Sequence, residues 1–279
     1  MRCAWNNLLA LVPPWLQQSV DEQGREHLQE LRLRIGRNPE LVLENQRTFY
    51  QRIVQPEDIK YCINAVSRYS PWTTSTTAKG YITSIGGHRV GLCGEAVVKN
   101  GKMTGIKTAT SVCIRVARDF PQIAAAAAKP GENILIIGKP GSGKTTFLRD
   151  LIRQRSGMGE TIAVVDERME IFPEEFFDPG IQTDVLSGCP KPEGIDTVLR
   201  TMGPECIAVD EITEESDCES LIRCAWCGVH LIATAHASSK KDLTSRSVYQ
   251  PLIKSNLFDK VIVLQPDKTW RLERIGYGY

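Results

Sequence analysis

Residues 134–146 read ILIIGKPGSGKTT, and this stretch decides the fold. Four apolar residues typical of a buried strand lead into the pattern G-x-x-x-x-G-K-T, which is met by Gly138, Gly143, Lys144 and Thr145. In this pattern backbone N–H groups cradle a polyphosphate, the lysine reaches the β and γ phosphates, and the threonine hydroxyl ligates Mg²⁺. The helix-like TTFLRDLIRQ that follows supplies the expected context, so the stretch predicts a nucleotide site. The residues expected to contact the nucleotide are Gly138, Lys139, Pro140, Gly141, Ser142, Gly143, Lys144, Thr145 and Thr146.

Length and charge restrict the class of protein. The chain has 279 residues, enough for two domains of ordinary size or one large one, and a net charge of +1. This balance argues against a protein dominated by attraction to nucleic acid or to an anionic membrane, although a local basic patch would be hidden in the sum. No apolar run approaches the ~20 residues that cross a bilayer, and MRCAWNNLLALVPPW at the start lacks the features of a signal peptide. We therefore expect a soluble, cytoplasmic protein.

The nine cysteines are expected to be reduced thiols, because their number is odd, they are widely scattered and no secretory signal is recognised. A zinc site is the alternative for one subset, which is Cys218, Cys224, Cys227 and His230. We favour a helix in which small cysteines pack much as alanine would, since no second C-x-x-C or H-x-x-x-H completes a zinc signature.

Residues 1–118 carry no nucleotide motif and predict a small α+β domain. LQELRLRIG and PELVLEN read as two strands with a short connection, and QPEDIKYCINAVSRYS reads as a helix with acidic residues in its first turn. HRVGLCGEAVVKNGKMTGIKTATSVCIRVAR holds alternating strands around the turn signal Asn100-Gly101. Residues 119–133, DFPQIAAAAAKPGEN, are expected to form a short helical linker or hinge, because alanine is the strongest helix former.

The pattern changes over residues 134–279, where apolar runs alternate with helical stretches. The runs are ILIIG, TIAVVDE, CIAVDE, VHLIATAH and KVIVLQP. Continuous apolar runs suit parallel strands that are covered on both faces. The second domain is therefore predicted to be an α/β, RecA/AAA-like P-loop ATPase core with a mainly parallel sheet.

The run CIAVDEI ends in acidic residues at the edge of the sheet where ligands bind. Asp210 is placed to hold Mg²⁺ through water, and Glu211 to orient or deprotonate the attacking water. An ordinary strand followed by a solvated acidic turn is the alternative. The phosphate cradle upstream favours the catalytic interpretation.

Two further runs end in polar residues. TIAVVDERMEI presents Asp166 and Glu167, which suggests several carboxylates sharing metal and water positioning, while a surface salt bridge of Arg168 is the alternative. VHLIATAH presents Thr234 and His236, where a polar residue can sense the γ-phosphate, while a structural hydrogen-bonding histidine is the alternative. In both cases the position at a strand end favours function.

Between these runs lies IQTDVLSGCPKPEGIDTVLRTMGPE, residues 181–205. Its glycine and proline content predicts a turn-rich loop leading to a helix that begins near Glu193 and carries Arg200. Spacing alone assigns this loop no role.

Several long motifs together resemble the stage III sporulation protein AA family, ATPases of endospore-forming bacteria that are similar to type II and type IV secretion motors. The motifs are GKPGSGKTTFLRDL, VVDERMEI, TDVLSGCPKPEG, VLRTMGPECIAVDEI and GVHLIATAH, with ELRLRIGRNPELVL, GGHRVGLCGEAVV and IRVAR in the first domain. The resemblance implies a ring-like, hexameric ATPase, peripheral at the cytoplasmic face of a channel that joins mother cell and forespore. Its implied partners are copies of itself and integral-membrane proteins of that channel.

The resemblance also implies roles for individual residues. VVDER would occupy the place of an acidic box and TAH that of a histidine box, which supports Glu167 and His236 as functional. Arg115 or Arg118 in IRVAR would contact bound nucleotide from the first domain. Gln182 departs from the basic residue expected before TDVL, which puts a phosphate contact from that position in doubt.

The leading hypothesis is an ATPase that converts hydrolysis into movement of one domain against the other. Lys144 and the loop amides would stabilise charge on the phosphoryl group, Thr145 and Asp210 would hold Mg²⁺, and Glu211 with Glu167 would align water. A P-loop small-molecule kinase is one alternative, although no arginine-rich lid is found. A nucleic-acid-binding ATPase that grips through ELRLRIGR is another, and the near-neutral charge and the absence of interleaved aromatics weigh against it.

Overall fold

The structure is a computed structural model that describes residues 1–44, 46–68, 80–173 and 176–274. The chain forms two compact units. Unit 1 comprises residues 1–119 and 173–177, and unit 2 comprises residues 120–172 and 178–279. Among the described residues, no helix has both the length and the apolar character that crossing a bilayer requires.

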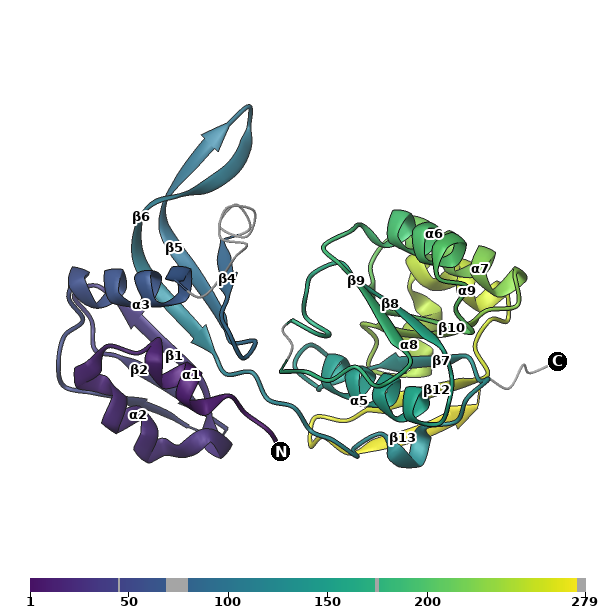
Figure 1. Cartoon of the computed structure of the whole chain (residues 1–279), viewed down its shortest axis with the longest axis horizontal. Coiled ribbons are helices and arrows are strands. Elements are labelled where there is room, and N and C mark those ends of the chain that lie inside the picture. The colour runs from purple at the N-terminus through teal and green to yellow at the C-terminus, as the bar shows by residue number, and fades with distance from the viewer. Residues whose placement is uncertain (45, 69–79, 174–175, 275–279) are drawn as a thin grey trace. The chain divides into compact units, whose positions relative to one another are not determined.

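Unit 1 is an antiparallel sheet with three helices, so the α+β expectation matches its described elements (Figure 1). The helices are α1 (Trp5–Ala10), α2 (Pro14–His27) and α3 (Pro56–Arg68). The strands are β1 (Leu28–Arg34), β2 (Glu40–Leu43), β3 (Arg47–Phe49), β4 (Tyr81–Thr83), β5 (Arg89–Lys99) and β6 (Lys102–Arg115). They pair in the order β3-β2-β1-β6-β5-β4. Helices α1 and α2 and strands β3 and β4 were not predicted from the sequence.

The core of unit 1 follows from the side-chain period of its elements. Alternate residues of β1, Leu31 and Leu33, are buried, and α3 buries Ile59, Cys62 and Val66 at the spacing of one helical face. These side chains belong to one hydrophobic cluster. The cluster fixes the register of the sheet, because a slip of one residue would expose the buried face of a strand.

Strands β5 and β6 form a long hairpin that extends beyond the rest of unit 1 (Figure 1). Asn100 and Gly101 make its turn with φ angles of 51° and 72°. Two successive positive φ angles are the signature of a type I′ turn, which asparagine and glycine tolerate best. The hairpin predicted from Asn100-Gly101 is confirmed.

Unit 2 contains a seven-stranded sheet in the order β13-β12-β7-β11-β10-β8-β9. Its strands are β7 (Ile134–Ile137), β8 (Ile162–Asp166), β9 (Thr183–Ser187), β10 (Cys206–Ile212), β11 (His230–Ala235), β12 (Lys260–Leu264) and β13 (Trp270–Arg274). All adjacent pairs are parallel except β12 and β13. The five predicted apolar runs are β7, β8, β10, β11 and β12, so the mainly parallel sheet is confirmed.

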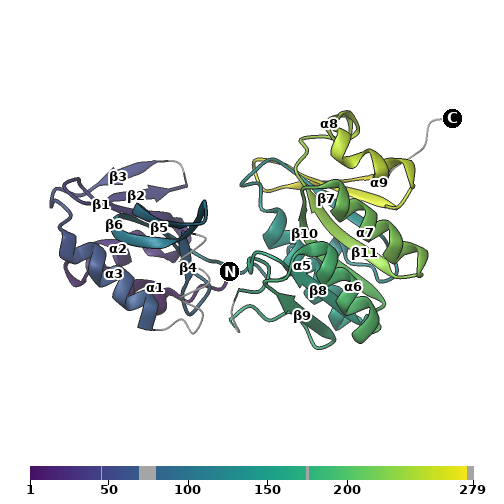
Figure 2. The same cartoon turned by 90° about the horizontal axis from the view of Figure 1, so that it is seen from above.

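Helices cover both faces of this sheet (Figure 2). They are α5 (Lys144–Gly157), α6 (Lys191–Thr201), α7 (Glu215–Trp226), α8 (Lys240–Ser245) and α9 (Gln250–Lys254), with short 3₁₀ helices at Ala125–Ala127 and Ser247–Tyr249. Leu135 of β7 and Val209 of β10 belong to one core cluster with residues of α6, α7 and α9. Alternate strand residues such as Ile136 are equally buried and lie outside that cluster, on the face that α5 packs against.

Two local expectations differ from the structure. The 181–205 stretch, expected to be a turn-rich loop before its helix, contains the strand β9 as well as α6. The alanine run forms a 3₁₀ helix of only three residues, which is in keeping with the marginal stability of helices so short. Just before it, Asp150 of α5 accepts the backbone N–H groups of Gln122 and Ala124 at 3.1 and 2.8 Å. The role of residues 119–133 as a hinge stays a prediction.

Candidate active site

The phosphate cradle begins where β7 ends. Gly138 is required there, because a Cβ at this position would lie 2.3 Å from Ser142 Oγ. Gly141 and Gly143 have φ angles of +75° and +99°, which side chains other than glycine adopt at a cost. The loop therefore has the tight, glycine-dependent backbone that a phosphate cradle requires.

Helix α5 starts directly after this loop, with Gly143 as its N-cap and no side-chain capping bond. Its first turn contains no acidic residue and includes Thr145 and Thr146. The first N–H groups of a helix lack partners within the helix, and the helix dipole favours negative charge beside them. This end of α5 is therefore suited to an anion such as a phosphate.

Lys144 lies in the cradle and is 7% exposed. Its ammonium group donates to the carbonyl oxygens of Gly138 and Lys139 at 3.1 and 3.3 Å and to His236 Nδ1 at 2.9 Å. Burial lowers the pKa of Lys144, while the nearby charges of Asp210 and Glu211 act to raise it. These three partners are neutral, so phosphate oxygens can replace them without breaking an ion pair.

Asp210 joins the cradle to the next two strands. Its Oδ2 accepts a hydrogen bond from Thr145 at 2.8 Å, and its Oδ1 accepts one from Thr234 at 2.5 Å. A hydroxyl and a carboxylate that lie this close together are hard oxygen donors of the kind that Mg²⁺ prefers. The donor set therefore fits Mg²⁺.

Glu211 sits in a bulge of β10. The pairing of β10 with β11 shifts register between Val209 and Ile212, and Glu211 has a φ angle of +37°. Successive residues of a regular strand point to opposite faces, whereas a bulge re-aims one of them. This is how neighbouring Asp210 and Glu211 both reach the same site.

The Glu211 carboxylate is held by an arginine and by a histidine. Arg168 Nη1 lies 2.7 Å from its Oε2, and His236 Nε2 lies 2.7 Å from its Oε1. His236 therefore accepts from Lys144 through one ring nitrogen and donates to Glu211 through the other. The salt bridge weighed for Arg168 does exist, and it ends on Glu211.

The two acids that end β8 are held differently. Asp166 is buried and accepts the backbone N–H groups of Glu170, Ile171 and Phe172 at 2.9 to 3.0 Å. Burial raises the pKa of Asp166, and these N–H donors act to lower it. Both oxygens of Asp166 thus shape the turn after β8 rather than facing the cradle, which argues against the shared metal role considered for it.

Glu167 contacts a residue that sequence reasoning missed. Lys191, at the start of α6, is 3% exposed and lies 2.5 Å from Glu167 Oε2 and 3.6 Å from Asp217 Oδ2. Lys191 falls within the motif TDVLSGCPKPEG, but that motif does not point to Glu167 or Asp217, which lie 24 and 26 residues away in the chain. Glu167 is consequently tied to the α6 and α7 side of the sheet in this structure.

Two other contributors were also missed. The Tyr249 hydroxyl accepts the backbone N–H of His236 at 3.2 Å and donates to Ile212 O at 3.3 Å, which braces the end of β11. Lys268, between β12 and β13, donates to Gly141 O at 2.5 Å and braces the cradle. Both are long-range contacts for which the sequence holds no spacing signal.

The remaining candidates lie outside this cluster of contacts. Arg115 pairs with Glu30 at 3.1 Å, and Arg118 donates to the carbonyl oxygens of Arg25 and Leu28, all within unit 1. Contact of Arg115 or Arg118 with nucleotide stays a prediction. Arg200 lies on the surface of α6, 3.9 Å from Asp196.

Two of the cysteines considered for a zinc site, Cys218 and Cys224, are instead part of the hydrophobic core. Cys218 and Cys224 of α7 are buried in the hydrophobic cluster of unit 2, and the Cys218 thiol donates to Val248 O at 3.2 Å. Burial raises the pKa of both thiols to about 12. Thiols with so high a pKa are poor metal ligands at neutral pH, because the thiolate is the ligand.

Two solved structures share the fold of this chain. The X-ray structure of the Legionella pneumophila ATPase DotB has a TM-score of 0.63 and 17% identity, covering 94% of this chain and 80% of that one. The pilus retraction motor PilT, crystallised with bound ADP, has a TM-score of 0.59 and 13% identity, covering 88% of this chain and 76% of that one. At these identities the likeness is one of fold, an α/β P-loop core with a mainly parallel sheet.

Sequence comparison identifies a relative with higher identity than these two structures. Stage III sporulation protein AA of Bacillus subtilis (strain 168) is 34% identical over 283 residues, which cover 94% of this chain and 92% of that protein. The family model described as "Sporulation stage III, protein AA" matches residues 6–274. The chain therefore belongs to the stage III sporulation protein AA family.

Proposed function

We propose that this protein is a Mg²⁺-dependent ATPase that acts as a ring-forming motor, peripheral at the cytoplasmic face of the channel between mother cell and forespore. One observation carries the enzymatic part of the proposal. Lys144, Thr145, Asp210, Glu211 and His236 are joined by hydrogen bonds across β7, β10 and β11, at the carboxyl ends of the strands. Ligands of open α/β sheets bind at that edge.

The cradle would bind the polyphosphate of ATP. The uncapped first turn of α5 supplies N–H donors, and the Lys144 ammonium exchanges two carbonyls and an imidazole for phosphate oxygens. When bound, Mg²⁺ would neutralise charge on the β and γ phosphates, and Thr145 and Asp210 would hold it. Thr234, which donates to Asp210, keeps that carboxylate oriented.

Glu211 is the residue best placed to orient the attacking water. Its carboxylate stands beside His236 and therefore close to the ammonium group of Lys144. A water that donates to this carboxylate gains nucleophilic character, and positioning of this kind contributes much of phosphoryl-transfer catalysis. We assign Glu167 a supporting role. Its ion pair with Lys191 holds the end of β8 in place, and from that end Arg168 reaches Glu211.

His236 connects the phosphate site to the catalytic carboxylate. In this arrangement one imidazole accepts from Lys144 and donates to Glu211. When Lys144 turns to a γ-phosphate, His236 loses its donor, and the Glu211 carboxylate responds through the second ring nitrogen. We propose that this is how the presence or loss of the γ-phosphate is reported to the rest of unit 2.

The motor part of the proposal rests on kinship and fold. The chain belongs to a sporulation family, and its fold is that of proteins described as an ATPase and as a retraction motor. By this analogy ATP would rest at a subunit boundary of a hexamer, with Arg115 or Arg118 contributing from the first domain. Integral-membrane channel proteins would be the partners.

Phosphate release from ATP, with and without Mg²⁺ and with no added acceptor, tests the enzymatic proposal. Lys144→Ala should abolish nucleotide binding, and Glu211→Gln should bind ATP yet hydrolyse it about 10²- to 10³-fold more slowly. Glu193→Gln, on the exposed side of α6, is the matched control and should behave as the parent protein. Unchanged turnover in both site variants, or turnover only with a small-molecule acceptor, would overturn the proposal.

A further inference from the structure

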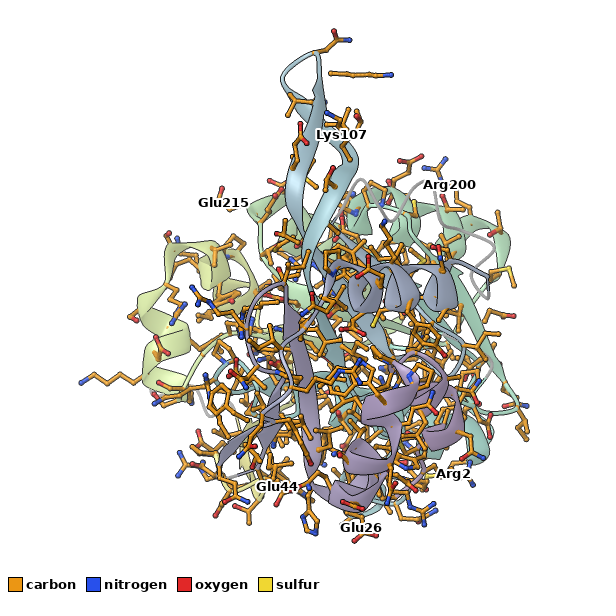
Figure 3. The ribbon with its side chains drawn as sticks, turned by 90° about the vertical axis from the view of Figure 1, so that its left-hand side faces the viewer. Arg2, Glu26, Glu44, Lys107, Arg200 and Glu215 are labelled. Carbon is orange, nitrogen blue, oxygen red and sulfur yellow. The ribbon has the colours of Figure 1, made fainter. Side chains whose placement is uncertain are left out.

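The outer half of the β5–β6 hairpin, residues 94–109, is called the hairpin arm below. At its base β6 pairs with β1 through residues 111–115, and β5 pairs with β4 through residues 89–91. Beyond that base, the arm's strands pair only with each other within the described part of the chain. Figures 1 and 3 show the arm projecting beyond the rest of the sheet, with Lys107 on its side, while Ile106 and Ala109 still pack against the hydrophobic cluster of unit 1. Two-stranded ribbons are marginally stable alone in water, so a projecting one is suited to contact with a partner.

The tip of the arm is cationic. Within residues 94–109 there are three lysines and one glutamate, hence a net charge of 3 − 1 = +2. Glu95 pairs with Lys107 at 3.1 Å, which leaves Lys99 and Lys102 beside the turn. These two lysines stand directly opposite each other in the ladder. Like charges in opposed positions are destabilising, and an anionic partner would relieve that repulsion.

The next rung of the ladder is apolar and exposed. Val98 pairs with Met103, and their exposed fractions are 60% and 39%. Neighbouring rungs face opposite sides of a two-stranded ribbon, so a surface meets both rungs only when it receives the tip of the arm. At the boundary of an anionic bilayer, the apolar side chains can then meet the acyl chains while long lysine stems carry their ammonium groups to the phosphates. Nucleic acid fits less well, because residues 94–109 include neither the arginines that read bases nor the aromatic rings that stack on them.

We propose that the hairpin arm is a membrane-contact element that binds the surface of an anionic lipid bilayer through Val98, Lys99, Lys102 and Met103. The near-zero net charge of the chain conceals this local patch. The arm belongs to unit 1 and shares no residue with the nucleotide cluster. Lipid binding is therefore independent of ATP hydrolysis, and the two proposals fail separately.

Flotation of the full-length protein with vesicles tests this proposal, in the absence of nucleotide and at physiological salt. Vesicles of phosphatidylcholine mixed with anionic phosphatidylglycerol are compared with vesicles of phosphatidylcholine alone. The protein should partition to the anionic vesicles. K99Q/K102Q should weaken partitioning about 25-fold, at about 5-fold for each lysine near an anionic surface. V98S/M103S should weaken it without any change of charge.

K241Q/K254Q is the matched control, because it removes the same charge from exposed lysines of unit 2. It should retain partitioning, and all three double variants should keep the parent's rate of phosphate release. Equal partitioning to neutral vesicles would overturn the proposal. So would an equal loss in the control variant, undiminished binding by both arm variants, or retention on a DNA duplex without retention on vesicles.

Discussion

Thr234→Val removes one hydroxyl from the centre of the site while keeping the side-chain volume. Thr234 is fully buried, donates to Asp210 Oδ1 at 2.5 Å and accepts the backbone N–H of Glu211 at 2.8 Å. A hydrogen bond to a charged group contributes about 1.5–3 kcal/mol to stability. The Glu211 N–H keeps its second acceptor, Asp210 Oδ1 at 2.9 Å. The main effect of the change is therefore that the Asp210 carboxylate loses a hydrogen-bond donor. We expect the free energy of unfolding of unit 2 to fall by about 2 kcal/mol.

Amide hydrogen exchange measures this loss in unit 2 alone. Peptides that span β10 and β11 should exchange about 30-fold faster in Thr234→Val, since every 1.4 kcal/mol is a factor of ten. The Mg²⁺ concentration that half-activates phosphate release should rise about 10-fold or more, as is typical when the partner of a metal ligand is lost.

Thr234→Ser is the control for this change. It keeps the hydroxyl and loses one methyl group, about 0.8 kcal/mol, so exchange should quicken only about 4-fold and Mg²⁺ activation should stay as in the parent. If Thr234→Val exchanged no faster than Thr234→Ser and needed no more Mg²⁺, the assignment of Asp210 and Thr234 as a metal-holding pair would be wrong.

Two further changes test other parts of the structure. Gly138→Ala places a Cβ 2.3 Å from Ser142 Oγ and 3.2 Å from Leu264 Cβ, which the loop accommodates only by shifting. Nucleotide affinity measured by calorimetry should therefore fall about 10-fold or more. Gly157→Ala is the control, because its Cβ meets nothing within 4 Å and affinity should stay unchanged. Glu40 is buried between Arg34 and Arg47 at 2.7 and 2.8 Å, and the hydrogen bond from Arg34 is the main reason that the pKa of Glu40 lies below its usual value. Because the folded state releases this proton more readily than the unfolded state, its contribution is complete above about pH 4.5 and is lost as the pH falls through the lowered pKa. Thermal melts of Glu40→Gln between pH 3 and 7 should show a flatter acid limb than the parent, and identical limbs would contradict this assignment.

The sequence was sufficient for the elements whose pattern is local. The buried strands of unit 2 are continuous apolar runs, and the Asn100-Gly101 turn needs only two residues to be recognised. The edge strand β9 was missed because Thr183–Ser187 is half-exposed and mixes polar with apolar residues, as a loop does. The alanine run was expected to be helical from propensity, but propensity alone does not stabilise so short a helix, and only Ala125–Ala127 form a 3₁₀ turn.

The site shows the same division between local and distant information. Asp166 and Glu167 are adjacent acids in one motif, and nothing in the sequence separates them. The structure turns Asp166 toward the backbone of the following turn and Glu167 toward Lys191, which lies 24 residues further on. Likewise, the bulge that aims both Asp210 and Glu211 at the cradle arises from the pairing of β10 with β11. Strand register is a tertiary property, so no reading of CIAVDEI alone would have revealed it.

The charges joined in the site give a physical reason for a divalent cation. Lys144 and Arg168 carry two positive charges, Asp210 and Glu211 carry two negative charges, and hydrogen bonds through Thr145 and His236 link them. With His236 neutral the cluster sums to zero. A polyphosphate that enters the cradle adds negative charge beside two carboxylates, and like charges this close repel strongly in a partly desolvated site. Because these four charged groups have no net positive charge to offset that addition, ATP binding should depend steeply on Mg²⁺.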